Sequence, residues 1–193
     1  MTLSLPQAKE RYCYADYLKW PDDQRCELIN GVPYLMTPAP GRRHQEILGN
    51  LFGLIWSFLR SAPGCRVFMA PFDVRLPAPG QKEEDIDNIV QPDLAVVCDQ
   101  RKLDEKGCLG APDIVVEVIS LATARKDLGL KFDLYESSGV PEYWVVFPRE
   151  KAVQVYKLNA AGKYERVGDY GPESVLTTEI LPGLEINLAE VFA

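Results

Sequence analysis

The order of apolar and polar positions along the chain predicts helices and strands that alternate through its middle. The segment 42–61, RRHQEILGNLFGLIWSFLRS, has apolar residues at 47, 48, 51, 54, 55, 58 and 59, which is the spacing of one face of a long helix. The runs QPDLAVV, APDIVVEVIS and EYWVVF are short and almost continuously apolar, as in strands that are buried on both faces. A second helix is predicted over 122–138, between the last two runs, and Gly139 is placed to end it.

Turn residues mark further hairpins at both ends of the chain. Asn30 and Gly31 stand between two apolar runs in RCELINGVPYLM, which is the strongest short signal for a hairpin. The runs AVQVYKL, KYERVGDY and SVLTT close the chain as two or three strands. We therefore expect an α/β (α+β) fold, a mixed β-sheet flanked by helices with extra N- and C-terminal hairpins. The strand, helix and strand between 115 and 146 should cross over right-handed, and 193 residues predict a single domain over 1–193.

Composition narrows the class of protein. The formal net charge of -7 excludes a protein that coats nucleic acid by charge alone, although the pairs at 42–43, 101–102 and 125–126 could form a local basic patch. The five cysteines show no CxxC spacing, so reduced, buried thiols are expected in place of disulfides or a zinc site. The chain opens without a basic segment followed by a long apolar run, and we expect a cytoplasmic protein with no membrane span.

Three ionisable residues stand in apolar surroundings. Glu117 lies in the middle of the run IVVEVI, and Asp93 follows Pro92 at the start of another predicted strand. Lys131 lies on the same predicted helical face as 128, 132 and 135. A buried carboxylate costs several kcal/mol unless a cation, a metal or several donors compensate it. Two carboxylates on neighbouring strands can share a divalent metal, and a nearby lysine can position water or stabilise charge on a phosphate.

At these residues the sequence resembles the PD-(D/E)XK nuclease superfamily, and more closely the Uma family of restriction-endonuclease-like proteins. The resemblance spans most of the chain, in five segments that stand in the family's order. They are CELINGVPYLM with Glu27, RRHQ with His44, QPDLAVV with Asp93, PDIVVEVIS with Glu117, and RKDLGLKFDLYESSGVPEYWVV with Asp127, Lys131 and Tyr135.

The resemblance implies a metal-dependent endonuclease that hydrolyses DNA phosphodiester bonds. In this interpretation Asp93 and Glu117 bind Mg²⁺ or Mn²⁺. The lysine of the superfamily motif would fall at Ile119, so the resemblance implies that Lys131 takes its place. Glu27 is expected as a further metal or water ligand. His44, the only histidine of the chain, is a further candidate for the site.

Two alternatives remain open beside the enzyme. The first is an inactive nuclease fold that binds nucleic acid or a protein partner, which need not bind Mn²⁺. The second is a structural homo-oligomer in which Glu117 and Lys131 form only a buried ion pair. Other chemistries fit poorly, because the chain has no Gly-rich phosphate loop and no GxSxG.

We also expect a homodimer, because the apolar tail at 179–193 exceeds what one core needs and two sites related by a two-fold axis suit the cutting of both strands.

Overall fold

The structure, a computed structural model, describes residues 10–21, 25–36, 39–120 and 123–193. Its centre is a six-stranded sheet in the order β12-β11-β10-β9-β6-β3. The strands are β3 (Arg66–Met69), β6 (Leu94–Val97), β9 (Ile114–Val118), β10 (Glu142–Phe147), β11 (Ala152–Leu158) and β12 (Tyr164–Tyr170). The β9 and β10 strands are parallel and the other neighbours are antiparallel, so the sheet is mixed, as predicted.

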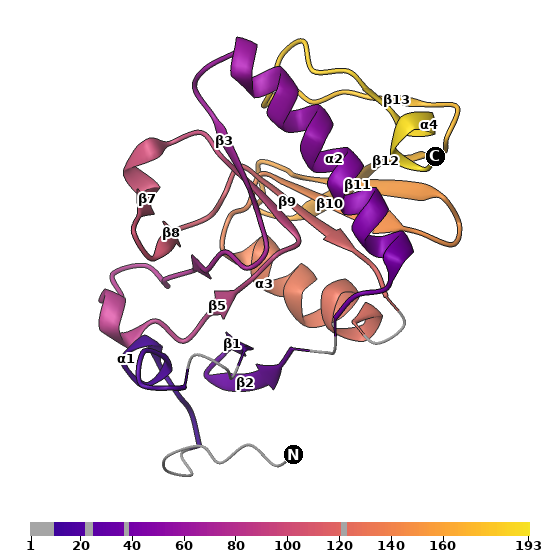
Figure 1. Ribbon diagram of the computed structural model, residues 1–193. Helices are drawn as coiled ribbons and strands as arrows, with labels where there is room; N and C mark the ends of the chain where they lie inside the picture. The colour runs from indigo at the N-terminus through magenta and orange to yellow at the C-terminus, as the bar shows by residue number, and fades with distance from the viewer. Residues whose placement is uncertain (1–9, 22–24, 37–38, 121–122) are drawn as a thin grey trace.

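Helices cover both faces of this sheet (Figure 1). The long helix α2 (Arg42–Ser61) has the bounds that its apolar spacing predicts. It packs Ile47, Leu51 and Ile55 on the face that carries Val116 and Val118. The opposite face is covered by a π-helical turn, η3 (Lys126–Lys131), and by α3 (Phe132–Ser137). Because side chains alternate along β9, Val115 and Glu117 point toward this second layer.

A second six-stranded sheet, in the order β2-β1-β5-β4-β8-β7, lies below and to the left of the first in Figure 1. Its strands are β1 (Cys26–Ile29), β2 (Val32–Leu35), β4 (Val74–Arg75), β5 (Ile89–Val90), β7 (Leu103–Asp104) and β8 (Gly107–Leu109). The predicted hairpin at Asn30 and Gly31 is confirmed, with φ of 51° and 75°, the left-handed region that such two-residue turns require. This hairpin belongs to the second sheet and does not extend the central one.

The remaining elements are short. They are α1 (Tyr14–Tyr17), the 3₁₀ turns η1 (Glu83–Asp85) and η2 (Gln100–Lys102), the strand pair β13 (Val175–Leu176) and β14 (Ile186–Asn187), and α4 (Leu188–Val191). The expectation that the C-terminal tail exceeds one core is wrong, because Leu188, Val191 and Phe192 are buried in the cluster formed by α2 and the central sheet. The tail therefore supplies no argument for a dimer.

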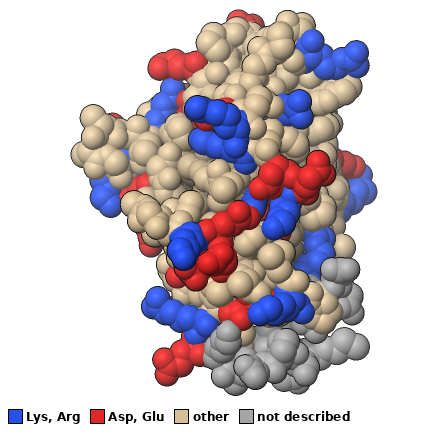
Figure 2. Space-filling view, turned by 90° about the vertical axis from the view of Figure 1, so that its left-hand side faces the viewer, with Lys and Arg blue, Asp and Glu red and all other residues tan. Residues whose placement is uncertain are grey.

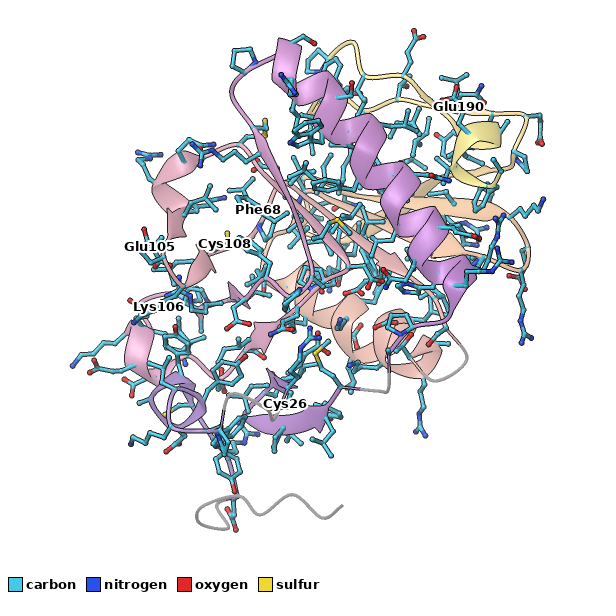
Figure 3. The ribbon with its side chains drawn as sticks, in the orientation of Figure 1. Cys26, Phe68, Glu105, Lys106, Cys108 and Glu190 are labelled. Atoms are coloured by element: carbon cyan, nitrogen blue, oxygen red, sulfur yellow. A yellow bond between two sulfur atoms is a disulfide. The ribbon has the colours of Figure 1, made fainter. Side chains whose placement is uncertain are left out.

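The expectation of five reduced cysteines is also wrong, because Cys65 and Cys98 form a disulfide. The antiparallel register pairs Arg66 with Val97, so the next residues outward, 65 and 98, face each other, which their sequence separation does not reveal. Cys26 and Cys108 are free and buried in the second sheet (Figure 3). Among the described residues no helix combines the length and the apolar character that a membrane span requires.

Candidate active site

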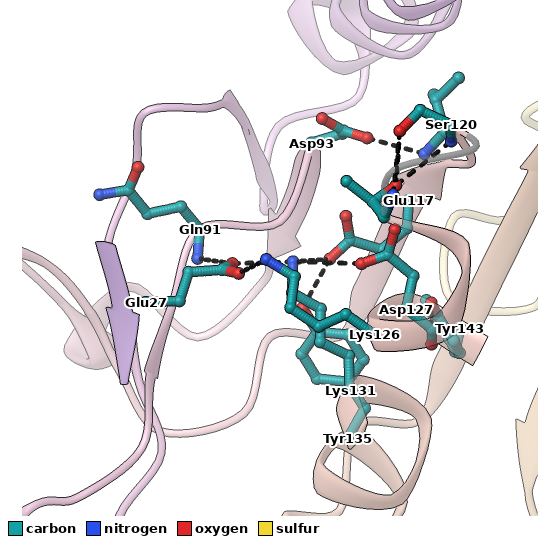
Figure 4. Close-up of polar contacts among 12 residues, drawn as sticks. Glu27, Gln91, Asp93, Glu117, Ser120, Lys126, Asp127, Lys131, Tyr135 and Tyr143 are labelled. Atoms are coloured by element: carbon teal, nitrogen blue, oxygen red, sulfur yellow. Dashed lines mark hydrogen bonds and ion pairs between the residues drawn. The ribbon is translucent and has the colours of Figure 1, made fainter. Parts of the chain in front are cut away.

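The five residues predicted for a site all line one pocket. It has a volume of about 550 Å³ and lies where the N-terminal end of α2 meets the start of β6, the end of β9 and the π-helical turn. The ionisable residues in its wall are Arg25, Glu27, His44, Asp93, Glu117, Lys126, Asp127 and Lys131. Figure 4 shows most of them in contact with one another.

Strand register brings Asp93 and Glu117 together. In the antiparallel pair of β6 and β9, Leu94 lies opposite Val116, so the next step along both strands places Asp93 opposite Glu117 on one face. The Oδ2 atom of Asp93 accepts a hydrogen bond of 2.7 Å from the backbone N–H of Val118. This bond fixes the carboxylate of Asp93 against the strand that carries Glu117.

Lys131 reaches this pair from the opposite layer. Its Nζ atom lies 2.7 Å from Oε1 of Glu117 and 2.8 Å from Oε1 of Glu27. The hydroxyl of Tyr135, one helical turn further, donates to the same Glu117 oxygen at 2.8 Å. Lys131 and Glu117 are both almost fully buried, so the pair is shielded from salt and has little freedom to move.

Glu27 is a fully buried residue of β1. Its Oε1 atom also accepts from the backbone N–H of Gln91 at 2.9 Å, and its Oε2 atom accepts from Nζ of Lys126. Both oxygens therefore have protein donors. This geometry suits a residue that positions the two lysines better than it suits a direct metal ligand.

Lys126 also belongs to this cluster, although the sequence did not single it out. Lys126 and Lys131 are five positions apart, and in an α-helix only residues three or four apart share a face. The turn from Lys126 to Lys131 is π-helical, with bonds from i to i+5, and both ammonium groups meet Glu27. The same change in helical spacing leaves the side chain of Leu128 43% exposed. The prediction that Leu128 shares one helical face with Lys131 is therefore wrong.

The neighbouring charges shift the pKa values of the buried groups in the pocket. Burial raises the pKa of Glu117 well above its ordinary value, and although Lys131 opposes this, Asp127, Asp93 and Glu27 add to it. Burial alone would lower the pKa of Lys131, but Glu117, Glu27 and Asp127 raise it well above the ordinary value. Lys131 is therefore a cation at neutral pH, and Glu117 gives up its proton less readily than an ordinary glutamate.

His44 stands in the first turn of α2 and supports Asp93. Its Nε2 atom lies 3.3 Å from Oδ2 of Asp93, whereas its Nδ1 atom is buried and has no hydrogen-bond partner. Burial would lower the pKa of His44, but the contact with Asp93 raises it above the ordinary value. The imidazole is thus placed to donate to Asp93 and not to coordinate a metal through Nε2.

The candidate basic patch at the start of α2 is engaged elsewhere. Arg42 pairs with Glu46 at 2.6 Å, and Arg43 donates to the backbone oxygens of Phe192 and Ala193 at 2.6 Å each. On the face shown in Figure 2 basic and acidic side chains are interleaved. That face offers no broad basic field, as the net charge predicts.

The donors of this pocket suit a divalent cation such as Mg²⁺ that is bound by two carboxylates and several waters. In the described part of the chain, no group of three or more His, Cys, Asp or Glu side chains is arranged around one point to hold a metal. Mg²⁺, however, is commonly bound by only one or two carboxylates and keeps several waters. Asp93 and Glu117 supply such a pair, and a cation beside Glu117 would oppose the negative charge of Asp127 and Glu27 near it.

Comparisons with known proteins agree with this fold. The family model Uma2, described as "Putative restriction endonuclease", matches residues 14–189. The chain therefore belongs to the Uma2 family, and the resemblance seen in the sequence is confirmed. An uncharacterized protein of Synechocystis sp. is 26% identical over 152 residues, which cover 77% of this chain and 75% of that protein.

A solved structure shares the architecture. It is the crystal structure of "a putative nuclease belonging to DUF820" from Anabaena variabilis, with a TM-score of 0.74 and 20% sequence identity over 94% of this chain and 97% of that one. At this identity the likeness establishes a shared fold, and the roles of individual residues are argued from their geometry.

Proposed function

We propose that this member of the Uma2 family is a metal-dependent endonuclease that hydrolyses phosphodiester bonds in DNA and acts as a single domain over residues 1–193. The observation that carries the proposal is the meeting of Asp93, Glu117 and Lys131 in one open pocket. They come from two strands and the helical layer of the opposite face. Perturbed ionisable groups that converge in a cleft are typical of active sites.

Asp93 and Glu117 would hold the cation, which is Mg²⁺ or Mn²⁺ in this proposal. When bound, such a cation polarises a phosphoryl oxygen and lowers the pKa of a bound water. The protein fixes both carboxylates beforehand, since Asp93 is tied to Val118 N and His44 and Glu117 is tied to Lys131 and Tyr135. Pre-organised ligands need no rearrangement when a substrate arrives.

The two lysines take different roles. Lys131 is held by Glu27 and Glu117 in the floor of the pocket, where its ammonium can orient a water for attack on phosphorus. The side chain of Lys126 is 17% exposed, so it can meet a non-bridging phosphate oxygen at the mouth of the pocket. Glu27 serves both lysines and controls their positions without touching the substrate.

The structural alternative, a buried ion cluster without activity, accounts for less of what is seen. A cluster that served stability alone would have no need of an open pocket. Here four carboxylates line one pocket of about 550 Å³ together with Arg25, His44 and two lysines, and burial raises the pKa of Glu117. A divalent cation beside Asp93 and Glu117 would relieve the repulsion between their carboxylates.

Nicking of supercoiled plasmid in Mn²⁺ or Mg²⁺ tests the proposal. The wild type should cut, and Asp93→Asn and Glu117→Gln should each be slower by roughly a hundredfold or more, the scale of losing one positioned electrostatic group. Glu150→Gln is the matched control, since Glu150 is exposed in the turn after β10. Absence of cutting by the wild type in both metals on supercoiled, linear and single-stranded DNA would favour the inactive binding module. Equal rates in wild type and Glu117→Gln would place the chemistry elsewhere.

A further inference from the structure

A second cavity of about 370 Å³ adjoins the active-site pocket. Its wall includes Tyr17, Trp20, Arg25, Pro71, Asp73 and Gln91. Arg25 and Gln91 also line the active-site pocket, so the two cavities share a wall. Aromatic and apolar surface with a few fixed polar groups, at this volume, is typical of a site for a small organic group.

The polar groups of this side pocket form one chain of hydrogen bonds that ends at the active site. The side-chain amide of Gln91 donates to Oδ1 of Asp73 at 2.7 Å and accepts from Arg25 at 3.0 Å. Its backbone N–H donates to Glu27. The hydroxyl of Tyr17 donates to the same Oδ1 of Asp73 at 3.2 Å. Asp73 therefore has one oxygen committed to the protein, and its position is fixed relative to Glu27.

The aromatic wall is equally well held. The ring of Trp20 lies 5.5 Å from that of Tyr12 and 5.4 Å from that of Tyr17, between ring centroids. Trp20 is buried and holds the partly exposed ring of Tyr17, which is the aromatic surface that a ligand can reach. A ligand that lies against a fixed aromatic surface pays little ordering cost in the protein.

The charges select what the side pocket can take. Arg25 is a cation in the wall next to the active site, and Asp73 is a carboxylate beyond it. Asp73 repels a phosphate but accepts hydrogen bonds from the N–H groups on the edge of a nucleobase. Base stacking on aromatic side chains together with arginine contacts to the backbone is the usual mode of binding single-stranded nucleic acid.

We propose that the side pocket binds the nucleobase of a nucleotide next to the scissile phosphate, and that Arg25 contacts the backbone phosphate between the two pockets. The inference rests on the proposed function and adds the class of substrate. A base that is still paired in a duplex cannot enter such a pocket. The preferred DNA is therefore single-stranded, or has an unpaired or flipped base beside the cut.

Binding of a fluorescent twelve-nucleotide single strand, measured by anisotropy in Ca²⁺, tests the side pocket apart from catalysis. The probe is compared with a series that carries one abasic site at each position in turn, and with the blunt duplex. We expect one abasic position to weaken binding about tenfold, the loss typical of one stacked base, and the duplex to bind more weakly than the single strand. A penalty below twofold at every position would overturn the inference.

Asp73→Asn then assigns the effect to this pocket. The amide oxygen can keep the bonds to Tyr17 and Gln91, and the other atom changes from an acceptor to a donor, so the abasic penalty should fall severalfold. Asp85→Asn, at an exposed aspartate of η1, is the control. A penalty that is the same in wild type and in folded Asp73→Asn would also overturn the inference. If Asp73→Asn does not fold, Tyr17→Phe, which removes one donor to Asp73, replaces it.

Cleavage of the same strands in Mn²⁺ separates the two proposals. If the wild type cuts DNA and no abasic position weakens binding, the proposed nuclease function stands and the side-pocket inference is overturned. If an abasic position weakens binding but the wild type does not cut, the side-pocket inference stands and the nuclease function is overturned. Absence of binding to every probe removes both.

Discussion

Replacing Lys131 by methionine tests whether one ammonium group holds the buried charges of the site together. Lys131 is 3% exposed and lies 2.7 Å from Glu117, 2.8 Å from Glu27 and 3.7 Å from Asp127. Methionine keeps an unbranched apolar side chain and removes the charge. Packing should therefore change little, while three carboxylates lose the cation that they share.

The size of the effect follows from burial. Removing one partner of a buried ion pair costs about 3–5 kcal/mol of folding free energy. Lys126 still neutralises Glu27 in the variant, so we expect the lower end, about 3 kcal/mol. For a chain of this length, about 2–4 °C per kcal/mol gives a fall in Tm of roughly 6–12 °C.

The dependence on pH has a definite sign. The pKa of Lys131 is raised above its ordinary 10.5, so its stabilising contribution is complete below pH 10.5 and is lost only as the pH rises through the higher folded value. The raised pKa of Glu117 means that its proton is held more tightly in the folded state, and the variant holds it more tightly still. The cost of Lys131→Met should therefore be smaller at pH 5 than at pH 8.

Thermal unfolding followed by circular dichroism at both pH values measures this cost. Lys82→Met, at a lysine whose side chain is 76% exposed, is the control and should change stability by less than about 0.5 kcal/mol. Plasmid nicking by Lys131→Met should be slower by about a hundredfold or more. A Tm of Lys131→Met equal to that of the wild type at pH 8, or a loss of stability that is larger at pH 5 than at pH 8, would contradict the prediction.

Three further predictions concern the metal, the thiols and the assembly. Calorimetry should show weak Mn²⁺ binding that strengthens as the pH rises through the raised pKa of Glu117, since the ion displaces a proton from Glu117, and Asp93→Asn should abolish it; equal binding by the variant would contradict the site. Alkylation of the denatured chain should label three cysteines before reduction and five after it, and five labels throughout would refute the disulfide between Cys65 and Cys98. Light scattering at tens of micromolar, a working concentration for weak association, tests the homodimer, for which the two-fold pairing of sites is the argument that remains once the tail is buried; the mass of two chains would keep it and the mass of one would remove it.

The elements that carry the site could be predicted from the sequence because their signals are local. The bounds of α2 and of β10 follow from runs of adjacent residues. Glu117 could be singled out because a carboxylate within an apolar strand needs a partner wherever the strand lies. The meeting of Asp93 and Glu117 follows from strand pairing once β6 and β9 are neighbours.

The features that could not be predicted from the sequence depend on long-range contacts or on irregular geometry. Nothing near Glu27 in the sequence shows that it meets Lys131, 104 positions away, because that contact needs the second sheet to dock beside α3. The pairing of Cys65 with Cys98 depends on a register that only the folded sheet sets. Lys126 was missed because regular helical spacing places it away from Lys131.

The π-helical turn shows why local regularity gives way at this site. A regular helix could bury Leu128, which is worth about 1.5–3 kcal/mol for a leucine side chain. The same helix would turn Lys126 away from Glu27 and leave one oxygen of a fully buried carboxylate without a donor. Leaving a buried acceptor without a donor costs about 1–3 kcal/mol, and more when the acceptor is charged, so the bond from Lys126 offsets the burial that Leu128 forgoes, although Lys131 still pairs with the other oxygen of Glu27. The turn that satisfies Glu27 also places a second ammonium group at the mouth of the pocket.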